Sequence, residues 1–222
     1  MKKNLFYLFA LVCAMSLFTA CSDDDDDVID SPVVGEWTLQ PLEVGDNATI
    51  LSSPIQLAVE PGDETIALFM NLGQQVLGQM LPEMLKKVEF LDNGKISATY
   101  VEDGVTKTDD THASFAKVSD SQIKVYLHLD EFKNEEMYQP FASLIAEGVP
   151  MNFAVNGNKM TILIEQSYLQ NKVLPVVDAL ISNLNTEDMD ETLVGILGLW
   201  STVFKPAMVN ATKLEVGLNL QK

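Results

Sequence analysis

The chain has 222 residues, of which 47% are hydrophobic, and its 14 basic residues against 32 acidic ones give a formal net charge of −18. Such a surface repels nucleic acid and anionic lipid headgroups, so neither is expected as a partner. Every basic residue is a lysine. Without arginine, the chain lacks the side chain that binds phosphate and carboxylate in a bidentate manner.

Residues 1–20 predict a secretory signal peptide. Lys2 and Lys3 give a short positive start, and an apolar run follows from Leu5 to Leu17. This run is too short for a transmembrane helix, and Ala20 supplies a small residue before the expected cleavage point. Cleavage would remove two lysines and no acidic residue. The mature chain would then carry 12 basic and 32 acidic residues, a net charge of −20.

The segment LFTAC, residues 17–21, resembles the lipobox of bacterial lipoproteins. The resemblance implies that Cys21 is acylated and that its lipid chains attach the protein to a membrane, because more than one chain gives stable anchoring. The alternative is an ordinary secretory peptide that leaves a free thiol at Cys21. Cys13 has no small residue before it and would be removed with the leader, so the mature chain has no second cysteine for a disulfide.

An acidic stretch follows Cys21 directly, formed by Ser22, Asp23, Asp24, Asp25, Asp26 and Asp27. Like charges at this density repel one another and cannot pack, so residues 21–32 are expected to be an extended tether. The stretch lacks the glycine and the spaced oxygen ligands of a calcium loop. It resembles the export signal of Bacteroidetes lipoproteins, which implies a lipid-anchored protein on the outer face of the outer membrane.

Residues 33–222 are expected to form a single domain. The opening segment VVGEWTLQ, residues 33–40, alternates apolar and polar side chains, as a half-buried strand does. Further strands are expected at 49–51 and 55–59. The apolar spacing then changes to three and four residues after Thr65, which predicts an amphipathic helix that Pro82 interrupts or kinks.

Three hairpins are predicted from turn residues between alternating runs: Asn93-Gly94, Ser119 to Ser121, and Asn156-Gly157. A helix is expected over 137–147, stopped by Gly148. Two more helices follow, one from Leu169 with a kink at Pro175 and one from Thr186, where acidic residues suit the helix start. The chain ends in an alternating strand, residues 212–221.

These elements predict an α+β fold. Eight to ten antiparallel strands would form a curved sheet or a small barrel covered by four inserted helices, closed by pairing of the last strand with the first. The opening Gly35-x-Trp37 resembles the first strand of lipocalin-like, or calycin-like, domains. The resemblance implies a beta barrel that holds a ligand. Lipocalins place one helix after the eighth strand, whereas this chain inserts four helices between strands.

No catalytic residue, metal site or cofactor is predicted. The chain has neither a Gly-x-Ser-x-Gly nucleophile elbow nor a Gly-Lys-Ser/Thr phosphate loop. Its two histidines and absent free thiols are too few for a zinc site, so His112 is interpreted as a solvated loop residue. The acidic group at 187–191 is explained by the helix dipole.

Aromatic and imidazole side chains supply the candidate pocket lining, namely Trp37, Tyr100, Tyr126, His128 and Trp200. His128 would either line a polar pocket or face water, and Trp37 would be either a core plug or a pocket floor. The apolar run 193–204 is either a buried core helix or part of a hydrophobic pocket or its lid.

Three functional hypotheses remain open. The leading one is a surface-tethered lipoprotein that binds a small apolar or amphipathic ligand or a glycan fragment. The second is a protein-interaction or structural subunit of an outer-membrane assembly without a ligand pocket. An enzyme comes third, because no group of nucleophile, base and orienting residue can be assembled.

Overall fold

The computed structural model describes residues 28–128, 144, 147–182 and 191–222. Within these ranges the strands are β1 (Gly35–Leu39), β2 (Glu43–Val44), β3 (Ile50–Ser52), β4 (Ile55–Glu60), β5 (Leu85–Phe90), β6 (Ile96–Glu102), β7 (Val105–Asp109), β8 (Ala113–Ser119), β9 (Gln122–Leu127), β10 (Val149–Asn156), β11 (Lys159–Ile164) and β12 (Lys213–Gln221). The α-helices are α2 (Glu64–Met84), α4 (Gln166–Tyr168), α5 (Leu174–Ser182), α6 (Glu191–Leu199) and α7 (Lys205–Val209).

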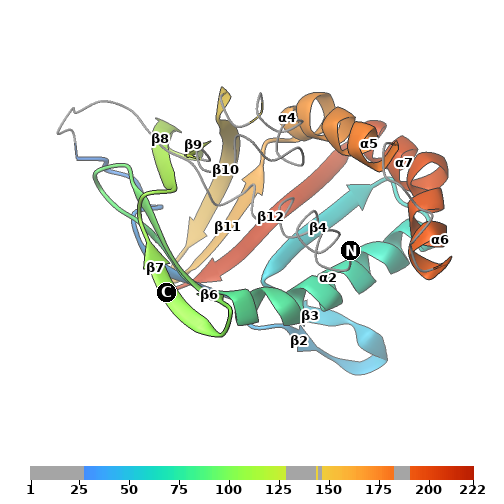
Figure 1. Ribbon diagram of the computed structural model, residues 1–222, viewed down its shortest axis with the longest axis horizontal. Helices are drawn as coiled ribbons and strands as arrows, with labels where there is room; N and C mark the ends of the chain where they lie inside the picture. Colours follow the sequence, from blue (N-terminus) through green and yellow to red (C-terminus); the bar gives the residue numbers. More distant parts are fainter. Residues whose placement is uncertain (1–27, 129–143, 145–146, 183–190) are drawn as a thin grey trace.

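Ten of these strands form one antiparallel sheet in the order β7-β6-β5-β1-β12-β11-β10-β9-β8, with β4 also paired to β12. The last strand therefore lies in the middle of the sheet (Figure 1). The predicted pairing of the first strand with the last is confirmed, because Thr38 lies opposite Gln221 and Leu39 opposite Leu220. The three predicted hairpins are confirmed as β5–β6, β8–β9 and β10–β11.

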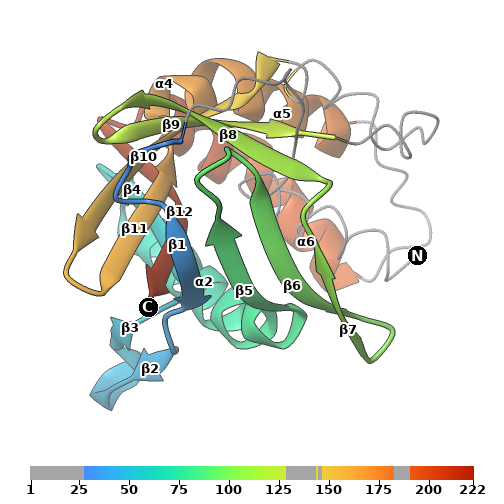
Figure 2. The same cartoon turned by 90° about the vertical axis from the view of Figure 1, so that its left-hand side faces the viewer.

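The sheet is strongly curved but not closed (Figure 2). An isolated bridge joins Lys95 to Ser114, and the Phe115 N–H donates to the Gly94 carbonyl at 2.6 Å, so the start of β6 touches β8. Beyond that point the edge of β6 is occupied, since Ala98 to Glu102 pair with β7. The prediction of a curved antiparallel sheet is thus confirmed, whereas the alternative of a closed small barrel is wrong.

The apolar side chains of the strands meet on the inside of this curve. Trp37 is completely buried, as its alternation with Glu36 and Thr38 predicts. Phe90 of β5 and Phe115 of β8 come from opposite parts of the sheet, yet their ring centroids lie 5.4 Å apart in an edge-on arrangement. One continuous core therefore fills the concave side of the sheet.

Helix α2 lies along β4. The Asp63 side chain caps its start by accepting from the Ile66 N–H at 2.9 Å. Gln74 donates from Nε2 to the Leu57 carbonyl at 2.6 Å, which satisfies an acceptor on β4. The helix includes Pro82 and ends at Met84, so Pro82 lies in the last turn and does not interrupt the helix.

The later helices contain two π-helical segments, η4 (Leu169–Val173) and η5 (Trp200–Phe204). Each segment ends two residues before a proline, Pro175 or Pro206. Proline has no N–H to donate to the carbonyl four residues earlier and its ring crowds that carbonyl, so a wider turn accommodates it. The structure places a π-helical segment in the turn before Pro175, and a kink at Pro175 itself stays a prediction.

Three helical stretches are described, at 64–84, 166–182 and 191–209, where the sequence predicted four. The fourth, over 137–147, lies outside the described residues except for Leu144 and Glu147, and so does the expected start at Thr186. The second and third stretches gather where β12 begins and β4 ends (Figure 1). No helix in the described part of the chain has the length and apolar character needed to cross a membrane.

Candidate ligand-binding site

The candidate site lies where β12 changes partner. Leu218 pairs with Ile55 of β4, whereas Leu220 pairs with Leu39 of β1. Asn219 stands between these pairs: its backbone N–H donates to the Pro54 carbonyl and its carbonyl accepts from the Gln40 N–H, both at 2.9 Å. Because β11 occupies the other edge of β12, β1 and β4 must share one edge and diverge there. We call this point the strand fork.

A pocket of about 450 Å³ opens at the strand fork. The hairpin β2–β3 connects β1 to β4 and projects from the body of the molecule (Figure 2). Its strand β3 contributes residues to the pocket lining. Five carboxamides line the pocket: Gln40, Gln56, Gln74, Asn156 and Asn219. The remaining lining residues are three with hydroxyl groups, three with aliphatic side chains and one lysine: Ser52, Ser53, Thr161, Ile50, Leu51, Ile55 and Lys159.

Asn219 holds this lining together. Its Nδ2 donates to the Ser53 carbonyl at 3.0 Å and to Gln56 Oε1 at 3.3 Å. Its Oδ1 accepts from the Thr161 hydroxyl at 2.8 Å. The Asn219 side chain therefore makes three hydrogen bonds within the protein, and it fixes neighbouring groups from β4, β11 and the segment before β4.

Other groups in the pocket retain hydrogen-bonding capacity. Asn156 and Lys159 are exposed, and within the described residues neither side chain makes a hydrogen bond or an ion pair. Gln74 uses its Nε2 on β4, which leaves its Oε1 as an acceptor. The pocket thus combines a fixed polar floor with open donors and acceptors at its rim, an arrangement suited to a polar ligand.

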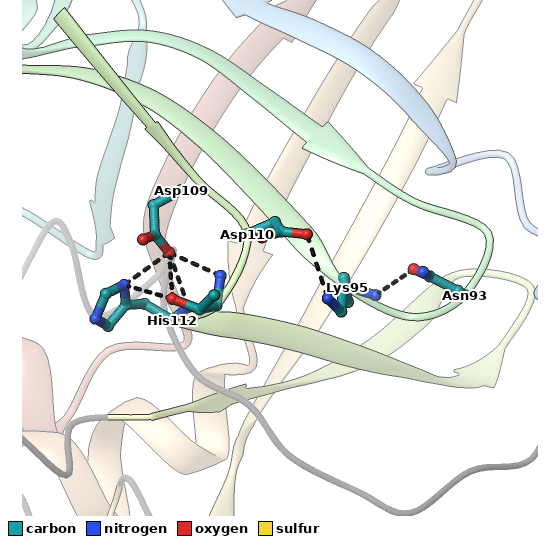
Figure 3. Close-up of polar contacts among 6 residues, drawn as sticks. Asn93, Lys95, Asp109, Asp110 and His112 are labelled. Carbon is teal, nitrogen blue, oxygen red and sulfur yellow. Dashed lines mark hydrogen bonds and ion pairs between the residues drawn. The ribbon is translucent and has the colours of Figure 1, made fainter.

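A second polar cluster lies in the turn between β7 and β8 (Figure 3). Asp109 Oδ1 accepts from the Thr111 N–H at 2.7 Å, the Thr111 hydroxyl at 2.8 Å and the His112 N–H at 3.1 Å. Nδ1 of His112 lies 2.7 Å from the same oxygen. Nζ of Lys95 forms an ion pair with Oδ2 of Asp110, the residue after Asp109, at 3.2 Å. One carboxylate oxygen therefore organises the whole turn.

The contact between Asp109 and Nδ1 of His112 fixes the orientation of the imidazole ring. Partial burial acts to raise the pKa of Asp109, but the hydrogen bonds from Thr111 and His112 outweigh it and lower the pKa from 3.8 to about 2. Among the described residues, Nε2 of His112 has no recorded hydrogen bond to a serine, threonine or cysteine side chain. The cluster therefore accounts for a stable turn and assembles no nucleophile with a base.

Two of the predicted lining residues belong to the core. Trp37 is fully buried, donates from its indole N–H to the Val33 carbonyl at 2.7 Å, and has the Lys222 ammonium 4.7 Å from its ring centre. Tyr100, on β6, is half-buried and packs against the same core.

The other three predicted lining residues lie outside the pocket at the strand fork. Tyr126 is half-buried on β9, close to Gly148, and His128 follows that strand with its N–H donating to the His112 carbonyl at 3.3 Å. Trp200 donates to Asp178 at 3.1 Å, and a hydrogen bond from Lys205 together with this one lowers the pKa of Asp178. None of the five predicted residues lines the pocket at the strand fork.

The pocket residues were missed because their meeting depends on a long-range pairing. Asn219 alternates with Leu218 and Leu220, so the sequence marks it only as the polar side of a strand. Its contacts are with Ser53 and Gln56, more than 160 positions away. A signal for the site would be a carboxamide on each of several strands, but such residues are also ordinary on solvated faces.

Within the described ranges, no group of three or more His, Cys, Asp and Glu side chains is arranged to hold a metal ion. The chain matches no known family model, no curated protein and no solved structure. Functional inference therefore depends on the geometry of the strand fork.

Proposed function

We propose that the chain is a lipid-anchored protein of the outer membrane that binds a glycan fragment in the pocket at the strand fork. The observation that carries the proposal is the lining itself, in which five carboxamides and three hydroxyl-bearing residues outnumber three aliphatic ones. A pocket for an apolar ligand is lined mostly by apolar and aromatic side chains. The glycan alternative among the expected ligands therefore has more support than the apolar one.

The chemistry of the lining matches the chemistry of sugars. A sugar hydroxyl both donates and accepts, and so does each carboxamide group. The Asn219 hydrogen bonds fix the floor before any ligand arrives, which reduces the ordering cost of binding. Leu51, with 68% of its surface exposed, offers an aliphatic contact for the C–H face of a sugar ring.

Attachment and location are further parts of the proposal. Acylation at Cys21 and the acidic stretch from Ser22 to Asp27 would place the domain on the cell surface, where glycans are met. The lipocalin-like kinship is proposed as well. Its support is the Gly35-x-Trp37 opening strand and two antiparallel meanders, β5 to β7 and β8 to β12, which flank β1 in the sheet.

The test is a glycan array probed with the full chain in detergent, beside the variant Asn156→Ala. The exposed Asn156 amide has no partner among the described residues, so its removal should weaken binding while leaving the melting temperature unchanged. Binding to a defined set of oligosaccharides that falls in the variant supports the proposal. A chain that binds no oligosaccharide on the array would overturn it.

The anchor is tested separately in cells. Cys21→Ala should move the protein from the membrane fraction to the soluble fraction, because the acyl chains would be absent. Replacing Asp23 to Asp27 with serine and glycine should keep the lipid but lose labelling of intact cells by a surface reagent. Membrane retention of Cys21→Ala would contradict acylation, and unchanged labelling would reduce the acidic stretch to a spacer.

A second candidate function, the interaction subunit, is favoured by one observation. Helix α2 exposes Leu68, Leu72 and Val76, at 58%, 47% and 54% of their surfaces, and their four-residue spacing puts them on one stripe. The variant Leu72→Lys should then abolish cross-links to other envelope proteins and leave glycan binding unchanged. Cross-links that persist in Leu72→Lys would contradict an interaction function for this face of helix α2.

A further inference from the structure

Lys159 is an exception among the lysines of this chain. Eleven lysines lie in the described residues, and seven of them form ion pairs: Lys87, Lys95, Lys107, Lys117, Lys172, Lys205 and Lys213. Lys86 donates to the Pro82 carbonyl, and two ammonium groups lie over aromatic rings, Lys124 over Tyr126 and Lys222 over Trp37. Within the described ranges, Lys159 alone has no partner for its ammonium group.

The surroundings of Lys159 are equally unusual. Acidic residues make up 32 of 222 positions in the chain, yet none of the twelve residues that line the pocket is acidic. Two acidic residues adjoin the lining: Glu215 accepts from Gln56 Nε2 at 2.8 Å, and Glu43 lies opposite Ser52 in the β2–β3 hairpin. Lys159 is therefore the one charged residue among the described residues that line the pocket, and its charge is positive in a strongly negative protein.

Lys159 lies at the rim of the pocket, next to Asn156. Asn156 and Lys159 are the last residue of β10 and the first of β11, and they lie directly opposite each other where the two strands meet the turn. Both are exposed and both line the pocket. A ligand group lying between them would receive hydrogen bonds from a neutral and a charged donor.

We infer that the pocket takes an anionic glycan, one that carries a carboxylate or sulfate group, with Lys159 as the countercharge and Asn156 as an additional donor. The inference rests on the proposed glycan function and specifies its substrate class. A lysine suits this role, because its ammonium is a point charge with three donors that needs no bidentate geometry.

The net charge of −18 does not oppose such a ligand at close range. At physiological ionic strength, charges farther apart than about 8 Å are largely screened, so the ligand responds mainly to the groups that line its pocket. The same screening makes the Lys159 contact sensitive to salt, since it lies at an exposed position.

The test measures the full chain in detergent by titration calorimetry against matched oligosaccharides. The probes are galactose oligomers, galacturonate oligomers of the same length, and sulfated galactose oligomers, each also at raised salt. Lys159→Gln removes the charge and keeps an amide. Lys117→Gln, on β8 and outside the pocket lining, removes the same charge elsewhere.

The inference predicts that a carboxylated or sulfated probe binds about tenfold more tightly than its neutral partner. That preference should disappear in Lys159→Gln and at high salt, and remain in Lys117→Gln. The two anionic probes distinguish carboxylate from sulfate. Equal binding of neutral and anionic probes would overturn the anionic specificity and leave the glycan function standing, whereas no binding of any probe would contradict both.

Discussion

The strand fork and the turn after β7 are both rich in polar side chains, but they use them in opposite ways. In the turn, four donor contacts converge on one oxygen of Asp109, so the polar groups satisfy one another. At the fork, Asn219 makes hydrogen bonds to the groups at the floor of a 450 Å³ pocket. The side chains of Asn156 and Lys159 at its rim have no partner in the part of the chain that the structure describes. Both clusters are partly exposed.

The difference separates a structural cluster from a candidate binding site. A polar group already paired within the protein stabilises the fold and offers little to a ligand, because an existing hydrogen bond would have to be broken. Unused donors beside an open volume make no contribution to the fold and are available for binding. Each variant below should therefore change stability or binding according to the region in which it lies.

The largest effect is expected at Gly217, two residues before the fork. A Cβ atom there would collide with the Ile162 carbonyl of β11, a backbone atom that cannot rotate away. Gly217→Ala should cost about 3 kcal/mol or more in unfolding free energy, measured by denaturant titration. Gly198→Ala is the control, because among the described residues no atom outside its own stretch of helix lies within 4 Å of its Cβ position. A stable Gly217→Ala protein would contradict the close approach of β11 to β12 that shapes the fork.

The second largest loss of stability is expected for Asn219→Ala. The substitution leaves the Ser53 carbonyl, the Gln56 amide and the Thr161 hydroxyl without their shared partner, at a cost of about 2 kcal/mol. Glycan binding should fall together with the melting temperature, because the floor is no longer fixed. Asn156→Ala is the matched control, since it should weaken binding without changing stability. Binding retained in Asn219→Ala would show that the floor needs no such preorganisation.

Asp109→Ala should destabilise the protein by about 2 kcal/mol at most at neutral pH. Because folding lowers the pKa of Asp109, its stabilisation is fully present above the ordinary value of 3.8 and is lost as the pH falls toward 2. The stability difference between wild type and Asp109→Ala should accordingly shrink between pH 4 and pH 2. Glycan binding at neutral pH should not change. A difference that is constant over this range, or lost binding, would contradict a purely structural turn.

Lys159→Gln should have the smallest effect on stability, within about 0.5 kcal/mol, because the exposed ammonium has no partner in the described structure. Its melting temperature should match that of wild type even where binding to an anionic oligosaccharide is lost. A clearly lower melting temperature would place Lys159 among the groups that stabilise the fold and contradict its assignment to the ligand.

The local elements were predictable from the sequence because their signals are local. Alternation located β1, β9 and β12, and turn residues such as Asn93-Gly94 located three hairpins. Strand β7 was missed although Asp103 and Gly104 precede it, an Asp-Gly pair in which both residues have positive φ, as two-residue hairpin turns require. That signal was present in the sequence and was overlooked.

Local sequence signals do not predict the openness of the sheet or the position of the pocket. The sheet does not close because β7 occupies the edge of β6, and the pocket exists because β4 and β1 share one edge of β12. Both follow from pairings between distant segments. Aromatic residues such as Trp37 were predicted to line a pocket. Large apolar side chains more often lie in the core, and Trp37 is fully buried.

The most direct test of the glycan site is to map binding by NMR on the side-chain amides, with the oligosaccharide that binds most tightly on the array. The side-chain NH₂ signals of Gln74, Asn156 and Asn219 should shift on titration. Those of Gln122 and Asn152, which bond to each other at 3.1 Å outside the pocket, should stay in place. Shifts at Gln122 and Asn152 with no change at the pocket amides would contradict a binding site at the strand fork.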